Sequence, residues 1–538
     1  MEKVFYNGRI LTMCCRNAAE EKQKATEAVL VRDGRIAAVG KLSDISAAPD
    51  AEYCDLHGKC LMPGFIDPHS HFLNNGQMAL RADLSDCSSF TDIVRVLKEY
   101  HKANPNAEVI AGFGYDHNFL EEGRHPDKFV LDRVSTELPV YIQHVSLHFA
   151  CANSVALQLA GLDENAEDPV GGKYGRVEGS RELSGYLEEK ATGPVSSLLL
   201  RAPAEYTPEM LEKMQEAYLR HGITTVQNGS TTPGAMAKLA KMGESGALKL
   251  DLVAYLTLTE QTKDALQAFS PYRKTYRDRV KIGGYKIFLD GSPQGRSAWM
   301  SKPYLGGEPD YCAYPRMTDE QVQSSIETAL RDRMQILAHC NGDAASEQYV
   351  AAYENALRQT GIDDELRPVM IHCQTVRNDQ LDRMKAIHMI ASIFVGHVWY
   401  WGDIHVKNFG PERGHHISPA KDAFERGVHV NFHQDTPVTR PNMLHSVWCA
   451  VNRISRRGNI IGADQKIPVY DALRAVTAEG AYQYFEEDEK GTIEIGKRAD
   501  FVILDKSPLD VPELEIRDLA VLETIKDGVT VYRNPSCQ

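Results

Sequence analysis

The sequence lacks a long apolar run, since its 538 residues contain no uninterrupted apolar stretch of about 18. We therefore expect no membrane span and no membrane partner. The first residues, M-E-K-V-F-Y-N-G-R-I-L-T-M, hold no basic segment followed by an apolar core, so we expect no signal peptide. Positive charge is also scarce, because 60 Lys and Arg against 74 Asp and Glu give a formal net charge of −14. Nucleic acids and anionic lipids attract basic surfaces, so neither is expected as a partner.

Regular cysteine spacing is missing as well. The 11 cysteines are scattered and odd in number, and the adjacent Cys14 and Cys15 have no second pair to complete a zinc-type cluster. In a long chain this usage indicates reduced thiols and a cytoplasmic enzyme rather than a disulfide scaffold. The remaining composition, 43% hydrophobic and 25% charged, is typical of a globular protein with a large core. It leaves open whether the chain forms a homodimer.

Strands and helices alternate from residue 208 onward. Helices are predicted over 210–221, 319–332 and 344–358. Short apolar segments predict strands over 222–226, 250–256, 280–289, 335–339, 369–372, 389–395 and 428–432. This alternation predicts an α/β fold, namely a (β/α)8 TIM-like barrel over 63–483 with a long insertion at about 75–207. A doubly wound open sheet is the second interpretation, but no glycine-rich phosphate-binding turn follows an early strand to favour it.

The two ends of the chain differ from this pattern. Residues 1–62 and 484–538 contain short strands separated by turns, and Arg32-Asp33-Gly34 is a strong hairpin signal. The simplest arrangement joins both ends in one small β-sandwich beside the barrel.

Two histidines follow an early strand in the run P-G-F-I-D-P-H-S-H. His69 and His71 are two apart, so both imidazoles leave one face of an extended chain, as two ligands of a divalent metal would. Later predicted strands deliver His339, His372 and Asp435. In such a barrel the functional side chains gather at the carboxyl ends of the strands. A single strand-end histidine is usually an ordinary polar residue, but the whole set predicts a metal site.

Lys286 stands out within the predicted strand 280–289. Because Tyr285 and Ile287 would point outward, Lys286 would point into the barrel, where an unpaired ammonium group is costly. An acidic partner such as Asp290 or Asp435, a lowered pKa, or conversion to a carbamate by carbon dioxide would each remove that cost.

Together these motifs resemble the amidohydrolase superfamily, in the branch that holds YtcJ-like proteins and N-substituted formamide deformylases. The resemblance covers essentially the whole chain and rests on P-G-F-I-D-P-H-S-H, G-I-T-T-V, Y-K-I-F-L-D-G-S, A-H-C-N-G-D-A-A, I-H-C-Q, Q-D-T-P-V and G-T-I-E-I-G-K-R-A-D-F-V-I-L-D. It implies a barrel with a metal centre and a β-sandwich built from both termini. By position it implies that the metal ligands are His69, His71, Lys286, His339, His372 and Asp435.

The resemblance also implies how these ligands are shared. His69 and His71 would bind one divalent ion, and His339 and His372 a second. We expect two zinc ions, with manganese, iron or cobalt as alternatives. A carbamylated Lys286 would bridge the ions, and Asp435 would ligate the first ion and transfer the proton as the catalytic residue.

The substrate-binding side is predicted from weaker signals. His148 and Asn153 match stretches of the inserted region and are either pocket residues or structural ones. Trp299, Trp399 and Trp401 follow strand-end motifs, so they either line an apolar pocket or pack loops together.

The leading functional hypothesis is metal-assisted hydrolysis of a carbon–nitrogen bond in an amide, such as an N-formyl or N-acyl amide of a small apolar or aromatic molecule. Hydrolysis of a cyclic amide stays open. A heterocycle deaminase is disfavoured, because those relatives usually have His-x-x-Glu where this chain has His339-Cys-Asn-Gly-Asp. A scaffold without catalysis would have lost ligands, and all six positions are filled. The branch commonly has serine before Asp435 and apolar residues after His339, and these departures leave the substrate open.

Overall fold

The computed structural model describes residues 2–78, 81–145, 149–169, 172–200, 206–306, 308–362 and 365–537. The chain divides into two units. The barrel unit consists of Met1–Phe72, Gln215–Thr436 and Pro441–Gln538, and the insertion unit consists of Leu73–Met214 and Pro437–Arg440. The insertion predicted at about 75–207 lies within the range of the insertion unit.

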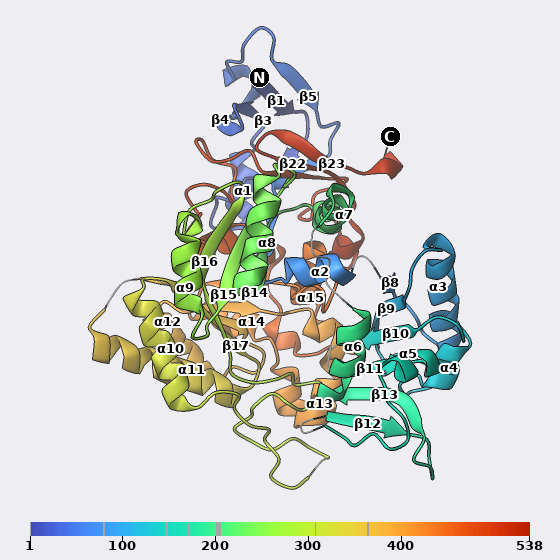
Figure 1. The fold of residues 1–538 in the computed structure, drawn as a ribbon. Helices are drawn as coiled ribbons and strands as arrows, with labels where there is room; N and C mark the ends of the chain where they lie inside the picture. The colour runs from blue at the N-terminus through green and yellow to red at the C-terminus, as the bar shows by residue number, and fades with distance from the viewer. Residues whose placement is uncertain are drawn as a thin grey trace. The chain divides into compact units, whose positions relative to one another are not determined.

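Eight parallel strands form the central sheet of the barrel unit (Figure 1). They are β7 (Phe65–Ile66), β14 (Ile223–Thr231), β15 (Asp251–Thr257), β16 (Val280–Phe288), β17 (Gln335–Cys340), β18 (Val369–His372), β19 (Ile390–Ile393) and β20 (Val430–Phe432). Each strand pairs with the next one in the chain. Beyond the two outer strands, the Asp435 amide donates to the His69 carbonyl (3.2 Å) and the His71 amide to the Thr436 carbonyl (2.7 Å). These bonds join the carboxyl ends of the first and last strands, and the predicted TIM-like α/β fold is confirmed.

Helices follow most of these strands and pack against them, as α8 (Pro233–Glu244) does against β14 and β16 (Figure 1). The predicted helices at 319–332 and 344–358 correspond to α10 (Asp319–Arg331) and α11 (Asp343–Thr360). A capping box at Thr318 and Gln321 begins α10, and Gly361, with φ 65°, ends α11 in the left-handed conformation that glycine favours. The helices of this unit include α1 (Ala18–Lys24), α8 (Pro233–Glu244), α9 (Thr262–Ala268), α10 (Asp319–Arg331), α11 (Asp343–Thr360), α12 (Asn378–Ala386), α13 (His397–His415), α14 (Ala420–Glu425), α15 (Met443–Asn452), α16 (Val469–Ala475) and α17 (Ala478–Gln483).

The chain termini meet in two further sheets of the barrel unit. One sheet contains β4 (Arg35–Gly40), β3 (Ala28–Arg32), β1 (Glu2–Tyr6) and β5 (Glu52–Asp55), in that order. The other contains β2 (Arg9–Ile10), β6 (Cys60–Pro63), β21 (Phe501–Leu504), β22 (Val521–Lys526) and β23 (Val529–Arg533). Phe5, Val31, Phe501 and Ile525 belong to one buried cluster shared by the two sheets. Both ends therefore build one β-sandwich, as the sequence predicts.

The insertion unit has its own sheet and core. Its strand order is β12 (Gly172–Arg176), β13 (Leu183–Glu189), β11 (Phe149–Ala152), β10 (Val140–His144), β9 (Ile110–Tyr115) and β8 (Ala82–Asp83). Its helices include α3 (Phe90–Ala103), α4 (Lys128–Asp132), α5 (Ser154–Leu159) and α6 (Gly193–Leu199). Helices α2 (Phe72–Met78) and α7 (Pro208–Leu219) stand where the chain passes from one unit to the other.

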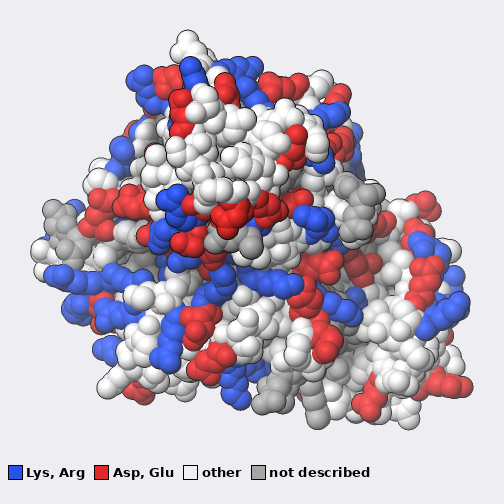
Figure 2. Space-filling view, turned by 90° about the horizontal axis from the view of Figure 1, so that it is seen from above, with Lys and Arg blue, Asp and Glu red and all other residues white. Residues whose placement is uncertain are grey.

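Two features of the described residues concern nucleic-acid and membrane partners, namely the distribution of surface charge and the length and apolar character of the helices. Figure 2 shows Lys and Arg interspersed with Asp and Glu on the face that it presents. Among the described helices, none combines the length and the apolar character needed to cross a membrane.

Candidate metal centre

The carboxyl ends of four barrel strands bring the predicted metal ligands together. His69 and His71 follow β7, His372 ends β18, and Asp435 follows β20. The Asp435 Oδ1 atom lies 3.3 Å from Nε2 of His69 and 3.3 Å from Nε2 of His71, and its Oδ2 atom lies 3.9 Å from Nε2 of His372. The ring centroids of His372 and His339 of β17 are 4.5 Å apart. The five residues therefore form one cluster.

The chemistry of this cluster fits a divalent cation. Although two imidazole nitrogens approach the buried Oδ1 atom of Asp435, this oxygen makes no hydrogen bond within the described part of the chain. Burial would raise the pKa of Asp435, but the adjacent His69 and His71 outweigh it and hold the pKa well below its usual range. A charged carboxylate and two imidazole nitrogens thus meet within 4.8 Å of one another, which is the donor set that a metal ion binds.

The tautomer of His69 is fixed by Gln227 on β14. The Nδ1 atom of His69 lies 2.6 Å from the Gln227 Oε1 atom, and the Gln227 amide nitrogen donates to the Pro68 carbonyl at 2.6 Å. Because the amide is held by this second bond, its oxygen faces His69, and the Nδ1 atom carries the proton. The Nε2 lone pair is then left toward Asp435. Burial and, secondarily, the charge of Lys286 lower the pKa of His69 to about 3, so the ring is neutral.

Asp290 plays the corresponding role for His339. Its carboxylate is fully buried and accepts from His339 Nδ1 at 3.0 Å. It also accepts from the backbone amides of Asn341 (3.0 Å), Gly342 (2.7 Å) and Trp299 (3.1 Å). These bonds fix the position of the carboxylate, which in turn orients the imidazole and leaves its Nε2 atom as the acceptor.

His433 is a site residue that the sequence analysis did not assign. Its Nε2 atom lies 3.3 Å from His372 Nδ1, and its Nδ1 atom lies 3.0 Å from the Ser392 hydroxyl. The sequence signal that could have identified His433 was its place two residues before Asp435.

The backbone is left-handed at two of the candidate ligands. His372 and Asp435 have φ values of 75° and 52°, a conformation that residues other than glycine rarely adopt.

Lys286 of β16 points into the barrel, as the strand alternation predicts. Its side chain is fully buried, and its Nζ atom makes no hydrogen bond to any described residue. Burial lowers the pKa of Lys286 to about 8. The acidic hydrogen-bond partner considered from the sequence is therefore missing among the described residues. The buried amine lies 5.1 Å from the centroid of the Phe288 ring and has no hydrogen bond.

A profile of the amidohydrolase family matches residues 52–532. The chain belongs to the amidohydrolase family. This amidohydrolase is 26% identical to YtcJ of Bacillus subtilis strain 168 over 99% of each chain, and 27% identical to the N-substituted formamide deformylase of Arthrobacter pascens over 98% of each. A structure of an uncharacterized metal-dependent hydrolase from Pyrococcus furiosus is similar, with a TM-score of 0.74 and 25% identity over 95% of this chain and 100% of that one. The family resemblance seen in the sequence is confirmed.

Of the two predicted pocket residues in the inserted region of this amidohydrolase, His148 lies outside the described residues. Asn153 is fully buried and caps α5. Its Oδ1 atom accepts from the amides of Val140 and Ala156, both at 2.9 Å, and its Nδ2 atom donates to the carbonyls of Ser135 (2.9 Å) and Leu138 (3.0 Å). All its hydrogen-bonding capacity is thus used on backbone groups, which favours the structural role that the sequence left open.

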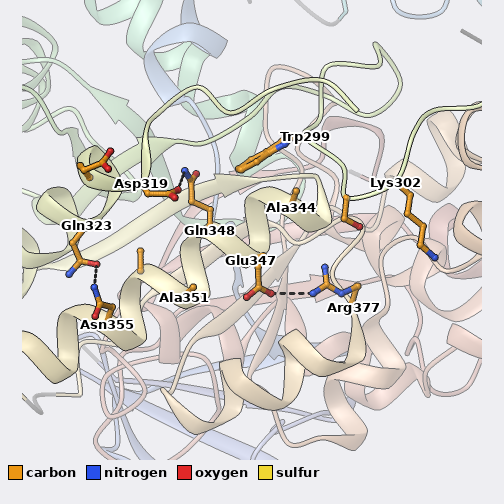
Figure 3. Close-up of a pocket in the computed structure, with 13 residues that line it drawn as sticks. Trp299, Lys302, Asp319, Gln323, Ala344, Glu347, Gln348, Ala351, Asn355 and Arg377 are labelled. Atoms are coloured by element: carbon orange, nitrogen blue, oxygen red, sulfur yellow. Dashed lines mark hydrogen bonds and ion pairs between the residues drawn. The ribbon is translucent and has the colours of Figure 1, made fainter. Parts of the chain in front are cut away.

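The predicted tryptophans have separate surroundings. Trp299 lines a groove of about 970 Å³ with residues of α10 and α11, among them Gln348 (Figure 3). None of the metal-centre histidines lines this groove. Trp399 packs edge-on against Trp448, with ring centroids 5.4 Å apart. Trp401 is 2% exposed and lies 4.6 Å from the His397 ring. Their role in substrate binding stays a prediction.

Proposed function

We propose that this amidohydrolase cleaves a carbon–nitrogen bond of an amide, such as an N-formyl or N-acyl amide with a small apolar or aromatic group. The observation that carries the proposal is the meeting of the Asp435 carboxylate with His69 and His71 at the barrel's carboxyl end, without a hydrogen bond at Oδ1. The formamide deformylase of Arthrobacter pascens, matched over nearly its whole length, supports the choice of an acyclic amide.

The donor atoms divide into two sets. His69, His71 and Asp435 would hold one divalent ion, and His339 and His372 would hold a second. Zinc suits imidazole and carboxylate ligands, and manganese, iron and cobalt can use the same donors. When bound, such ions supply Lewis acidity that polarises the amide carbonyl and makes water more acidic.

The chain's own residues supply the proton transfer. Asp435 is charged at neutral pH, so its carboxylate can accept a proton from the attacking water and deliver it to the leaving nitrogen. The imidazoles of His69 and His339 are held by Gln227 and Asp290, which keeps their lone pairs aimed at the centre during the reaction.

The buried amine of Lys286 is proposed to become a carbamate. The neutral Nζ atom would form a bond to the carbon of carbon dioxide and release one proton, which gives an anion with two oxygens. Such a group would replace the amine that has no hydrogen bond and supply two oxygen donors between the two histidine sets.

We further propose that the protein binds a small-molecule substrate rather than nucleic acid or a membrane.

The experiment compares metal content and turnover in wild-type protein and the His69→Ala, His71→Ala double variant. We expect the double variant to lose at least the divalent ion assigned to His69, His71 and Asp435, together with all amide hydrolysis. The control is the His57→Ala, His388→Ala variant, which removes two solvent-exposed imidazoles and should keep both properties. Hydrolysis that persists in the first variant would rule out the metal mechanism.

The bond that is cleaved is tested separately with wild-type protein. A screen of N-formyl, N-acyl and cyclic amides and of amino-substituted heterocycles should give turnover of acyclic amides, with a carboxylic acid and an amine as products. Turnover of cyclic amides alone would assign the protein to cyclic-amide hydrolysis, and ammonia release from a heterocycle would assign it to deamination.

A further inference from the structure

The insertion unit contains a second cluster of metal-binding side chains. Asp116, His117 and His144 each present a ligand atom, and these atoms lie within 4.8 Å of one another. Asp116 and His117 directly follow β9, and His144 ends the neighbouring parallel strand β10. Side chains at the carboxyl ends of adjacent parallel strands commonly form binding sites, because these ends converge at one edge of the sheet.

An irregularity in the strand pairing brings the three residues together. The register between β9 and β10 shifts after the pair Gln143 and Phe113, so that His144 lies opposite Tyr115 rather than Gly114. Gly114 has a φ of 99°, a conformation that other residues rarely adopt. Such bulges redirect side chains next to functional sites. Here the bulge places His144 beside the residues that follow Tyr115.

The three ligand atoms have the spacing of one face of a coordination shell. The distance from His117 Nδ1 to His144 Nε2 is 3.2 Å, and the distances from Asp116 Oδ1 to these atoms are 3.9 Å and 3.5 Å. The nearest point equidistant from all three lies about 2.1 Å from each, which matches the ~2.0–2.2 Å bonds that zinc makes to imidazole nitrogen and carboxylate oxygen. The cluster needs little rearrangement to hold an ion.

Neighbouring groups hold these ligands in place. The Asp116 Oδ1 atom accepts from the backbone amide of Asn118 at 3.0 Å and from its side chain at 2.9 Å. The His117 ring stacks on the His125 ring with centroids 4.0 Å apart. The Nδ1 atom of His125 is hydrogen-bonded to the Tyr115 hydroxyl at 3.0 Å. The side chain of His144 is 5% exposed and that of His117 is 27% exposed, so an ion can reach the cluster from the His117 side.

We propose that Asp116, His117 and His144 bind a divalent transition-metal ion of the zinc class. Two imidazoles and one carboxylate leave at least one coordination position for water or another ligand. This site is built entirely from the insertion unit and shares no residue with the barrel centre. The competing arrangement is a hydrogen-bonded network in which a proton, rather than a metal ion, lies between the two imidazoles.

Calorimetric titration of zinc chloride into the full-length His69→Ala, His71→Ala protein tests the proposal, because the barrel centre is impaired in that background. We expect a binding event of about one ion per chain that disappears when His117→Ala and His144→Ala are added. Adding His57→Ala and His388→Ala instead should leave the event unchanged. Identical titrations of all three proteins would overturn the proposal, whatever the barrel centre proves to do.

A milder variant guards against loss of folding. His117→Gln alters the more exposed ligand only, and its circular dichroism and melting temperature should match those of the background protein. We expect it to weaken zinc binding at this site at least tenfold. Cobalt should show the same dependence, with visible absorption bands that the variant lacks. A folded variant with unchanged zinc affinity and cobalt spectrum would show that the cluster is only a hydrogen-bonded network.

Discussion

At the scale of single residues, the candidate metal centre depends on partners that set the protonation state of its histidines. Gln227 and Asp290 fix which nitrogen of His69 and His339 carries the proton, while burial keeps His69 neutral. Lys286 is the exception, since it is equally buried but has no hydrogen-bond partner among the described residues. A fold does not usually keep such a group unless it is modified or bound in the working protein.

Replacing Lys286 by alanine should remove metal and activity together, because the variant lacks the amine from which the carbamate forms. Added acetate or propionate should restore part of both, since a small carboxylate can occupy the vacated space and replace the bridging oxygens. Metal analysis and amide turnover, each measured with and without the carboxylate, check this expectation.

The control for that experiment is His339→Ala, which removes an imidazole ligand from the adjacent strand. Carboxylates should not rescue this variant, because they do not replace a neutral nitrogen donor. A Lys286→Ala protein that keeps its full metal content and turnover would exclude the carbamate.

At the scale of elements, helix α13 shows that two tryptophans in one turn can have different roles. Trp401 is almost fully buried, and its ring lies 6.1 Å from that of Phe394, whose ring is in turn 5.3 Å from His433. Trp399 is only partly buried and packs on Trp448. Trp401 therefore supports the residues behind the metal centre, whereas Trp399 retains surface that a substrate could contact.

Alanine substitutions should separate these roles. Trp401→Ala should lower the free energy of unfolding by about 3–5 kcal/mol, as expected for a large aromatic side chain removed from a core. Trp399→Ala should cost less stability and raise KM for aromatic amides much more than for small ones. Denaturant titrations and KM values for matched aromatic and aliphatic amides test both expectations. An equal rise in KM for both amides would mean that Trp399 only packs against its neighbours.

The sequence predicts the elements better than the contacts between them. The strand predicted at 369–372 agrees in full with β18, and the one predicted at 389–395 overlaps β19, because apolar runs bounded by turns are local signals. The candidate ligands could be selected from the sequence because they stand at strand ends. The hydrogen bond between His69 and Gln227 could not be predicted, since it joins residues 158 positions apart and depends on strand register in the folded sheet. The cluster around His144 depends on a bulge in the same way.

At the scale of the whole barrel unit, a buried charge network ties the C-terminal part of the chain to the barrel. The carboxylate of Asp251, at the start of β15, accepts from Lys490 at 2.6 Å and from Lys526 of β22 at 2.7 Å. All three side chains are at most 4% exposed. Burial would raise the pKa of Asp251, but the two lysines outweigh it and hold the pKa far below its usual range. One strand of the β-sandwich is thereby held to a barrel strand by ion pairs shielded from water.

Asp251→Asn should lower the free energy of unfolding at pH 7 by about 2–3 kcal/mol, because it removes the charged acceptor that two buried ammonium groups share. Lys490 keeps Glu486 at 2.9 Å and Lys526 keeps Asp500 at 2.6 Å, so neither charge is left alone. The contribution of Asp251 is present above the unfolded-state pKa of about 3.9 and is lost as the pH falls toward the lower folded-state pKa. The difference in unfolding free energy between variant and wild type should therefore narrow in strong acid.

Glu99→Gln is the matched control, because the Glu99 carboxylate is 63% exposed and pairs with Arg95 at the surface. This variant should change the free energy of unfolding by less than ~0.5 kcal/mol. Urea unfolding curves at pH 7 and pH 3 measure both variants, and an Asp251→Asn protein as stable as the control would show that the network does not hold the sandwich to the barrel.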